Sequence, residues 1–300
     1  MNLRDLVYLD ALAEYRHFGR AAEACEVSQP TLSSQIRKLE DELGVMLLER
    51  TNKRVEMTPV GSRILEHARG VLRAVDSIRD EARGARDPLV GPIKLGVIPT
   101  LAPYLMPYIL KPLREAYPGL TIDLWEDQTQ ALIESLRNHK LDAALLATKA
   151  DAPEVTEIAL FVEPLLAALP VDHALANRNR VREEDLADEL LVLAEGHCLA
   201  NQALTACGTK HGRKAALQGS MQAATLDTLV NLVAAGYGAT LIPSLAVDSL
   251  SRRDIAVRRL AGHSSRTIRL ASRPGYPRPQ ALRALERVIR KAVGSTCQTP

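Results

Sequence analysis

The sequence of 300 residues is poor in cysteine and has neither a secretory leader nor a long apolar run. Four cysteines in a chain of this length do not make the disulfide framework of a small secreted protein. The N-terminal residues MNLRDLVYLDALAEY carry acidic side chains and no apolar core segment, so we expect no signal peptide. No stretch approaches the roughly 18 uncharged apolar residues that cross a bilayer. These absences predict a cytoplasmic protein whose cysteines are thiols unless they do chemistry.

The net charge of +2 is too small to identify a partner, but the charges are unevenly distributed. Residues 1–60 contain eight Lys and Arg against ten Asp and Glu, whereas residues 251–300 contain twelve basic residues against two acidic ones. Charge alone therefore favours a nucleic-acid site at the C-terminal end. We interpret the basic end instead as the solvated faces of a helix and a strand. The motifs place the nucleic-acid site at the other end of the chain.

Three short helices and a tight turn are predicted in the first 45 residues. Apolar residues from Leu6 to Ala13 recur at helical spacing, and a second short helix opens at Gly19. A third helix is capped by Ser28, with Pro30 in its first turn, where a missing N–H group costs nothing. Two short helices, a turn and a capped third helix are typical of a helix-turn-helix.

A wing and a long helix are predicted next. The segment LLERTNKRVEMTPVG suggests two short extended pieces around residues 51–54, and Thr58-Pro59 starts a helix that ends near GARDPLVGP. Apolar residues along this helix form a heptad seam, which favours pairing with a second copy over packing on its own domain. The seam consists of Ile64, Ala68, Val71, Val75, Ile78 and Ala82. We therefore expect a DNA-binding domain over residues 1–58 and a dimerisation helix over residues 59–87.

From Ile93 onward, strands and helices alternate. The expected strands are IKLGVI, LTIDLWE, LDAALLA, LLAALP, LLVLA and TIRLAS, and the clearest helices are TQALIESLRNH, ATLDTLVNLVAAG and PQALRALERVIRKAV. Such alternation predicts an α/β fold with mainly parallel sheets covered by helices, and its length suits two lobes with a cleft between them. We expect this part to occupy residues 88–300, with lobe I at about 88–164 and 266–300 and lobe II at about 165–265.

The N-terminal motif resembles the LysR-type transcriptional regulators through HFGRAAEACEVSQPTLSSQIRKLEDELGVMLLERTNKRVEMTPVG, residues 17–61. The resemblance implies a winged helix-turn-helix, a linker helix and a two-lobed regulatory domain like the periplasmic binding proteins. It also implies that the third helix enters the major groove of double-stranded DNA. Short polar side chains at a helix start suit base edges and phosphates, and Arg and Lys suit phosphate or guanine. The candidate DNA contacts are Gln29, Thr31, Ser33, Ser34, Gln35, Arg37 and Lys38 on the helix, with Arg50, Lys53 and Arg54 on the wing.

The segment AEGHCLANQALTACG places Cys198 and Cys207 nine residues apart, between His197 and His211. Structural zinc sites usually pair ligands two to four residues apart, so this spacing disfavours a metal site, and we expect neither a metal nor a cofactor. From the residues alone, two inert core cysteines remain the default. The adjacent histidine, able to stabilise a thiolate, and the second thiol within reach favour a reactive pair instead.

The same segment is similar to that of the peroxide-sensing members of the LysR family, which implies that Cys198 reacts with hydrogen peroxide and Cys207 resolves it. VIPTLAPYL, EDQTQ and SRTIRLASRPG carry three further matches, which imply a peroxide pocket of Thr100, Thr129, His197 and Arg266. The thiol must be deprotonated, so we expect Arg266 or hydrogen bonds to lower its pKa. At residues 200–201 this chain has Ala-Asn, where many relatives carry charged residues. We expect this difference to affect the rate of the reaction with peroxide more than the type of reaction.

These observations predict a peroxide-responsive transcriptional regulator rather than an enzyme. The resemblance implies a dimer of dimers, contact with RNA polymerase and a thiol reductant. The Ala- and Leu-rich CLANQALTAC favours a helix in the reduced protein, which has to unwind before a disulfide forms. The alternatives are a LysR-type regulator that binds an organic effector in the cleft, and a cysteine peroxidase or zinc protein. Cys25 fits a core position, and Cys297 fits a terminal tail.

Overall fold

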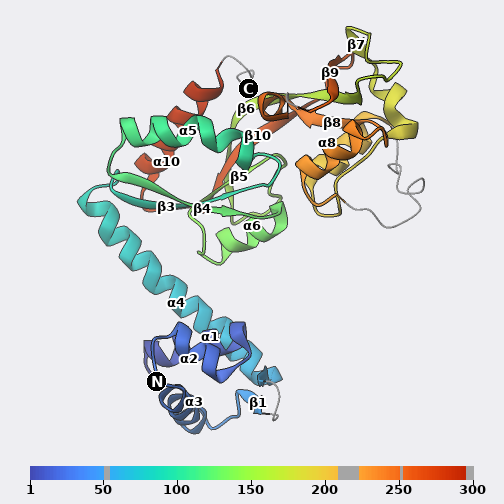
Figure 1. The fold of residues 1–300 in the computed structure, drawn as a ribbon. Helices are drawn as coiled ribbons and strands as arrows, with labels where there is room; N and C mark the ends of the chain where they lie inside the picture. Colours follow the sequence, from blue (N-terminus) through green and yellow to red (C-terminus); the bar gives the residue numbers. More distant parts are fainter. Residues whose placement is uncertain (51–54, 209–222, 251–252, 295–300) are drawn as a thin grey trace. The chain divides into compact units, whose positions relative to one another are not determined.

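The computed structural model describes residues 1–50, 55–208, 223–250 and 253–294. The chain divides into two compact units, Met1–Arg83 and Gly84–Pro300, and each is described by itself (Figure 1). No helix in the described ranges is both long and apolar enough to cross a membrane.

The first unit begins with the three expected helices. Asn2 caps α1 (Leu3–Tyr15) by accepting the N–H groups of Arg4 and Asp5, and the Asp5 carboxylate accepts the N–H of Asn2 in return. The third helix, α3, is capped by Ser28, whose hydroxyl accepts the Thr31 N–H. The elements of this unit are α1, α2 (Phe18–Ala24), α3 (Gln29–Leu43), β1 (Leu48–Arg50), β2 (Val55–Met57) and α4 (Pro59–Arg86). The predicted Ser28 cap is therefore confirmed, and the helices expected from apolar periodicity and at Gly19 are present, the latter starting one residue earlier, at Phe18.

A buried carboxylate fixes the wing to α3. Glu40 is buried, and its Oε1 accepts the backbone N–H groups of Leu47 at 2.9 Å and Leu48 at 3.2 Å. These bonds begin the antiparallel pair of β1 and β2, in which Leu48 lies opposite Met57. The wing strands are thus held by the same helix that carries most of the candidate DNA contacts.

The long helix α4 starts at Thr58, as expected. The Thr58 hydroxyl accepts the Gly61 N–H at 2.9 Å. Along the predicted seam, Ala68 is buried within the first unit, whereas Val71 and Ile78 are 46% and 68% exposed. The distal part of the seam is therefore uncovered in a single chain.

The second unit is built on one eight-stranded sheet. The strands run in the order β4-β3-β5-β10-β6-β9-β7, and β8 also pairs with β6. Its strands are β3 (Gly91–Val97), β4 (Leu120–Glu126), β5 (Ala143–Leu146), β6 (Thr156–Pro170), β7 (Arg180–Val181), β8 (Thr240–Pro243), β9 (Ile255–Leu260) and β10 (Ser265–Ser272). Its helices are α5 (Ala102–Ala116), α6 (Thr129–Arg137), η1 (Glu183–Glu189), α7 (Cys198–Ala206), α8 (Leu226–Ala234), η2 (Ser244–Ala246), α9 (Val247–Leu250) and α10 (Pro279–Val293).

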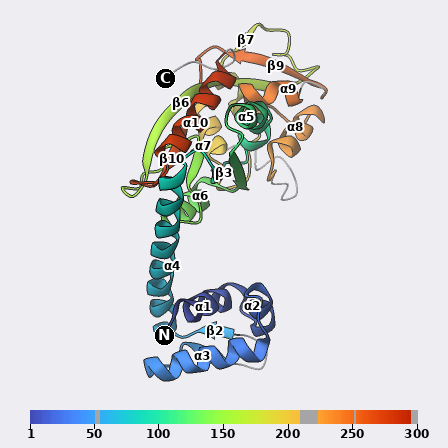
Figure 2. The same ribbon diagram turned by 90° about the vertical axis from the view of Figure 1, so that its left-hand side faces the viewer.

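Two lobes share this sheet. Helices α5 and α10 lie side by side on one face of β3, β4 and β5, and α6 covers the other face (Figures 1 and 2). Strands β6 and β10 run from this lobe into the lobe that contains α7, α8, β7, β8 and β9. Along β6 the pairing partner changes at residues 164–165: Pro164 pairs with β10, while Leu165 pairs with β8.

The expectation of mainly parallel sheets is wrong. Only the pairs β3–β4, β3–β5 and β7–β9 are parallel; β10–β5, β10–β6, β6–β8 and β6–β9 are antiparallel. The chain crosses between the lobes through β6 and returns through β10, so these two strands oppose their neighbours. The predicted strand LLVLA is also wrong, because residues 190–193 form only isolated bridges, from Leu190 to Ala239 and from Leu193 to Ala223.

The close contact at Gly61 yields a test of the wing's position. A Cβ atom at residue 61 would lie 2.1 Å from the Leu47 carbonyl oxygen, whereas one at Gly70, also in α4, meets nothing closer than 3.6 Å. Gly61→Ala should therefore destabilise the first unit by about 1–3 kcal/mol through overpacking. The control Gly70→Ala should stabilise it by about 0.5–1 kcal/mol through helix propensity. Hydrogen exchange of the backbone amides in α1 and α3 measures both changes in stability. Equal protection in the two variants would contradict the prediction.

Candidate functional site

The two cysteines lie at opposite ends of one helix. Cys198 is the first residue of α7, His197 precedes it, and Cys207 ends the helix by donating its N–H to the Ala203 carbonyl at 3.0 Å. Cys198 and Cys207 are both free thiols. Nine helical residues rise about 13 Å, so the two thiols are too far apart for a disulfide in this state. The expected helix is confirmed.

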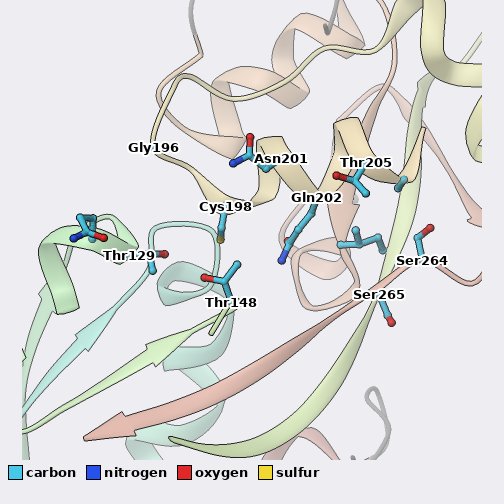
Figure 3. A pocket seen from close by; sticks show the side chains of 12 residues that line it. Thr129, Thr148, Gly196, Cys198, Asn201, Gln202, Thr205, Ser264 and Ser265 are labelled. Atoms are coloured by element: carbon cyan, nitrogen blue, oxygen red, sulfur yellow. The ribbon is translucent and has the colours of Figure 1, made fainter. Parts of the chain in front are cut away.

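A polar cavity of about 580 Å³ opens beside Cys198 (Figure 3). The Cys198 sulfur is directed between Thr129, at the start of α6, and Thr148, which follows β5. The cavity is lined by Thr129, Gln130, Thr148, Leu165, Gly196, Cys198, Asn201, Gln202, Thr205, Ala206, Ser264 and Ser265. The structure thus brings Cys198 and Thr129 to one surface, with several further hydroxyl and amide groups.

Two polar atoms at this cavity are buried without a hydrogen bond of normal geometry among the described residues. They are Thr129 Oγ1 and Gln202 Oε1. Gln202 is held by its other end, because its Nε2 donates to the Ala147 carbonyl at 2.9 Å. Thr129 Oγ1 lies close enough to Cys198 to lower the pKa of that thiol. Buried unpaired polar atoms are costly, so both atoms are suited to a small polar molecule beside the sulfur.

Arg266 lies behind this cavity in a buried network. Its Nε donates to Glu163 Oε2 at 2.8 Å, and both side chains of this ion pair are 0% exposed. Its two terminal nitrogens donate to the hydroxyl and the carbonyl of Thr100, each at 2.9 Å. Glu163 Oε1 in turn accepts the Leu245 N–H at 2.9 Å. Thr100 and Arg266 are therefore joined to each other, but neither is among the residues that line this cavity, where the sequence placed them.

The expected lowering of the Cys198 pKa is not found. Burial raises the pKa of this thiol, and the opposing effects of the Arg266 charge, the Thr129 hydroxyl and the N–H groups at the start of α7 do not reverse that direction. Arg266 acts in the expected sense, but its charge is already compensated by Glu163. In this state the thiol form of Cys198 is favoured over the thiolate.

His197 does not supply a positive charge to the thiol. The side chain is buried, and burial lowers its pKa despite a hydrogen bond to the backbone of Ala224. The imidazole is therefore neutral near neutral pH. His197 can therefore stabilise a thiolate at Cys198 only as a neutral hydrogen-bonding group, and its predicted place in the peroxide pocket stays a prediction.

Cys207 is less exposed than Cys198, and its thiol is harder to ionise. It is 2% exposed, and burial together with the Glu183 carboxylate raises its pKa to about 11. Glu183 is itself fixed by the Gly262 N–H at 2.9 Å and the Ser264 hydroxyl at 2.7 Å. At neutral pH this thiol is therefore almost entirely protonated. In this state Cys207 is an inert member of the core.

Sequence reasoning missed two residues of the site, Glu163 and Gln202. Glu163 had a visible signal, since it is an acidic residue inside the otherwise apolar strand segment LFVEPLL and must therefore find a buried partner. Gln202 had only a weak one: it lies four residues after Cys198 and hence on the same face of a helix. Neither signal identifies the partner, because both partners are distant in the chain.

Helix α3 has one buried apolar face and one exposed face that carries most of the candidate DNA contacts. Leu32, Ile36 and Leu39 are buried and fix the helix in its unit. Most of the polar candidates lie on the outward face: Gln29, Thr31, Ser34, Arg37 and Lys38 are exposed, and Ser33 and Gln35 are half-buried. A helix with one anchored apolar face and one polar, basic face suits a groove of DNA.

Some predicted positions lie outside what the structure describes. On the wing, Lys53 and Arg54 lie outside the described residues, as does the side chain of Arg50. His211 and Cys297 also lie outside them. Cys25 is half-buried against the core of the first unit. Within the described ranges, no group of three or more His, Cys, Asp or Glu residues is placed to hold a metal ion.

The chain belongs to the LysR family, whose bacterial regulatory helix-turn-helix matches residues 3–62 and whose LysR substrate binding domain matches residues 86–294. The family resemblance seen in the N-terminal motif is thereby confirmed, as is the α/β fold with a winged helix-turn-helix and a regulatory domain like the periplasmic binding proteins. The members of this family are transcription regulators, not enzymes.

Within that family, the chain is similar to OxyR proteins. It is 46% identical over 293 residues to the DNA-binding transcriptional dual regulator OxyR of Escherichia coli, covering 97% of this chain and 95% of that protein. A full-length Pseudomonas aeruginosa OxyR with a cysteine-to-aspartate substitution has a TM-score of 0.76 at 38% identity, covering 97% and 95% of the two chains. A hydrogen-peroxide-bound Corynebacterium glutamicum OxyR with a cysteine-to-serine substitution has a TM-score of 0.66 at 34% identity, covering 98% and 93%.

The arrangement around Cys198 predicts different roles for two threonines of the cavity. Thr129→Val removes the hydroxyl that lowers the Cys198 pKa, so this pKa should rise further and oxidation by peroxide should slow by about tenfold or more. Thr148→Val is the matched control, because Thr148 also lines the cavity but is not among the groups that lower the thiol's pKa. The pH dependence of iodoacetamide alkylation and stopped-flow oxidation measure the two quantities. Equal slowing in both variants would assign the effect to cavity polarity in general.

Proposed function

We propose that this protein is a cytoplasmic, peroxide-responsive transcriptional regulator in which Cys198 is the reacting thiol. The observation that carries the proposal is the position of Cys198 at the start of α7, facing a polar cavity with the buried Thr129 hydroxyl beside its sulfur. The similarity to OxyR proteins, including one bound to hydrogen peroxide, supports the same assignment. Hydrogen peroxide is small and polar, with donors and acceptors that match the Thr129 hydroxyl and the Gln202 carbonyl.

In the proposed reaction, the Cys198 thiolate attacks one oxygen of hydrogen peroxide along the O–O bond. An S–O bond forms, the O–O bond breaks, and the leaving hydroxide takes up a proton to become water. The sulfur is oxidised to a sulfenic acid, and the peroxide is reduced. Thr129 positions the peroxide and supports the leaving oxygen, while Arg266, held by Glu163 and Thr100, stabilises the negative charge on sulfur.

A disulfide then forms when the Cys207 thiolate attacks the Cys198 sulfur and hydroxide leaves. The sum of the two steps is one peroxide and two thiols giving one disulfide and two waters. Two barriers oppose the second step in the reduced state: the length of α7 and the high pKa of Cys207. Unwinding the end of α7 removes both, since it brings the thiols together and exposes Cys207 to water. The disulfide therefore selects a second conformation of this lobe.

The response reaches DNA through the first unit. The outward face of α3 binds the major groove of the operator, and Arg50, Lys53 and Arg54 of the wing contact the neighbouring backbone or groove. The uncovered part of the α4 seam pairs with a second chain, and two such dimers form a tetramer. RNA polymerase is the downstream partner, and a cellular thiol reductant returns the protein to its reduced state.

A second candidate function is favoured by the size of the cavity. A volume of about 580 Å³ is far more than hydrogen peroxide fills, and it is typical of sites for organic molecules. A LysR-type regulator with an organic effector at this position would leave its cysteines as bystanders. The two functions differ in whether peroxide consumes thiols.

The roles of the two thiols are tested by adding one equivalent of peroxide to the reduced protein. The unsubstituted chain should lose two titratable thiols. Cys198→Ser should lose none, and Cys207→Ser should accumulate a sulfenic acid that dimedone traps on Cys198. Cys25→Ser is the matched control and should behave like the unsubstituted chain, since Cys25 lies in the other unit.

Hydrogen exchange on the same samples follows the conformational step. Protection of residues 198–208 should fall after oxidation of the unsubstituted chain and stay unchanged in Cys198→Ser. Thiols that survive peroxide would favour the effector-binding regulator, and a dimedone adduct on Cys207 would reverse the roles of the two cysteines. Disulfide formation without any change in protection would leave the chemistry intact and remove the switch.

The DNA interface is tested through its salt dependence. Arg37→Ala or Lys38→Ala should weaken operator binding and reduce the slope of log affinity against log salt by about one unit if the side chain neutralises one phosphate. Lys149→Ala, an exposed charge of the regulatory half, is the control and should leave the slope unchanged. Loss of preference at a single base position, with the slope intact, would identify a base contact instead.

A further inference from the structure

A second cavity, of about 640 Å³, lies near the crossover strands. Its walls are apolar side chains of β6 and β9, among them Val162, Leu166 and Leu260. Its polar lining is positively charged or neutral: Arg180 from β7, Arg259 from β9 and His263 from the loop before β10. It shares Leu165, Ser264 and Ser265 with the cavity beside Cys198, but it contains neither Cys198 nor Thr129. It is therefore a separate site.

Strand pairing and the loop after β9 bring the basic side chains of this cavity together. Arg180 and Arg259 are direct partners in the parallel pairing of β7 and β9. A terminal nitrogen of Arg180 lies 3.5 Å from Nε2 of His263. Like charges directly opposite each other on neighbouring strands destabilise a sheet. A cluster of this kind is stabilised when an anion binds between its members.

No carboxylate of the described residues pairs with Arg180 or Arg259. The neighbouring arginines of the same segment differ in this respect: Arg178 and Arg182 both form ion pairs with Asp185, at 3.6 and 2.7 Å. Glu183, three residues after Arg180, instead accepts the Gly262 N–H and the Ser264 hydroxyl. Both guanidinium groups thus line the cavity without a carboxylate partner among the described residues, and both are exposed to solvent.

A buried hydroxyl supplies an independent sign of a ligand. Ser244 lines the cavity from η2, and its Oγ is buried without a hydrogen-bond partner among the described residues. A buried hydroxyl without a partner is costly, and a bound oxygen atom would satisfy it. The site thus offers two guanidinium groups, one imidazole and one unpaired hydroxyl around an apolar wall.

We infer that this cavity binds a small organic anion, with its carboxylate or phosphate group at Arg180, Arg259 and His263 and its apolar part against Val162, Leu166 and Leu260. Guanidinium groups bind such oxyanions through pairs of parallel hydrogen bonds, and the volume suits a small organic molecule. A bare inorganic anion leaves the apolar walls unfilled. This site is independent of the proposed peroxide chemistry, since it uses none of its residues.

The test is isothermal titration calorimetry of the reduced full-length protein with matched probes. Hexanoate and hexyl phosphate carry the two candidate head groups on one apolar chain, hexanol has the chain without charge, and inorganic phosphate has the charge without the chain. At least one hexyl anion should bind more tightly than both hexanol and inorganic phosphate. Preference for hexanoate or for hexyl phosphate identifies the head group.

Substitutions then identify the residues that bind the anion. Arg180→Ala and Arg259→Ala should each weaken the preferred anion by about tenfold or more, because each removes charge-assisted hydrogen bonds. Arg182→Ala, two residues from Arg180 but paired with Asp185, is the matched control and should have no effect. Ser244→Ala removes the unpaired hydroxyl and should weaken binding without changing any charge, which keeps the test valid if an arginine variant folds poorly.

Three results would overturn the inference. The first is the absence of heat from either hexyl anion. The second is equal affinity for hexanol, which would indicate apolar binding alone. The third is equal weakening by Arg182→Ala and Arg180→Ala, which would indicate a general surface charge effect. Peroxide oxidation of the Arg180→Ala protein should proceed at the unsubstituted rate, so failure of this inference is distinguishable from failure of the proposed function.

Discussion

The buried ion pair between Arg266 and Glu163 is the interaction on which the regulatory unit depends. Both side chains are fully removed from water, and they join β10 to β6 at the place where these strands pass between the lobes. Removing one partner of such a pair leaves an uncompensated buried charge, at a cost of about 3–5 kcal/mol. The remaining donors and acceptors of the pair bind Thr100 and the backbone of Leu245, so one network connects the turn before α5, the crossover strands and η2.

This pair also explains why Cys198 is poised rather than permanently ionised. A free guanidinium behind the sulfur would favour the thiolate, but Glu163 compensates most of its charge, and burial then decides the direction of the pKa. A thiol that is largely protonated reacts slowly with most oxidants and electrophiles, because the thiolate is the nucleophile. In the proposed function, selectivity then rests on the contacts that hydrogen peroxide makes with Thr129 and Gln202.

The fold and the site differ in how far the sequence predicts them. The helices α1, α3 and α10 follow from caps and periodicity within a few residues, and these signals are local. The antiparallel crossover strand β6 was mostly missed, since its pairing with β10 joins residues about a hundred positions apart. Thr100, Thr129 and Arg266 were predicted from the family resemblance. The neutrality of His197 and the raised pKa of Cys198 depend instead on burial, which is produced by segments distant in the chain and is not visible in the local sequence.

The strand β6 runs through both lobes from Thr156 to Pro170, with one register shift in its pairing with β10, between Ile268 and Arg269. Sliding one lobe along it would shift the register by whole residues, and a shift of one residue would turn every buried side chain outward. A continuous strand does permit twisting along its length. The lobes can therefore change their relation by rotation about the crossover strands but not by translation along them. Atoms near a rotation axis move least, so the charged network behind Cys198 keeps its geometry while the outer edges of both lobes travel furthest.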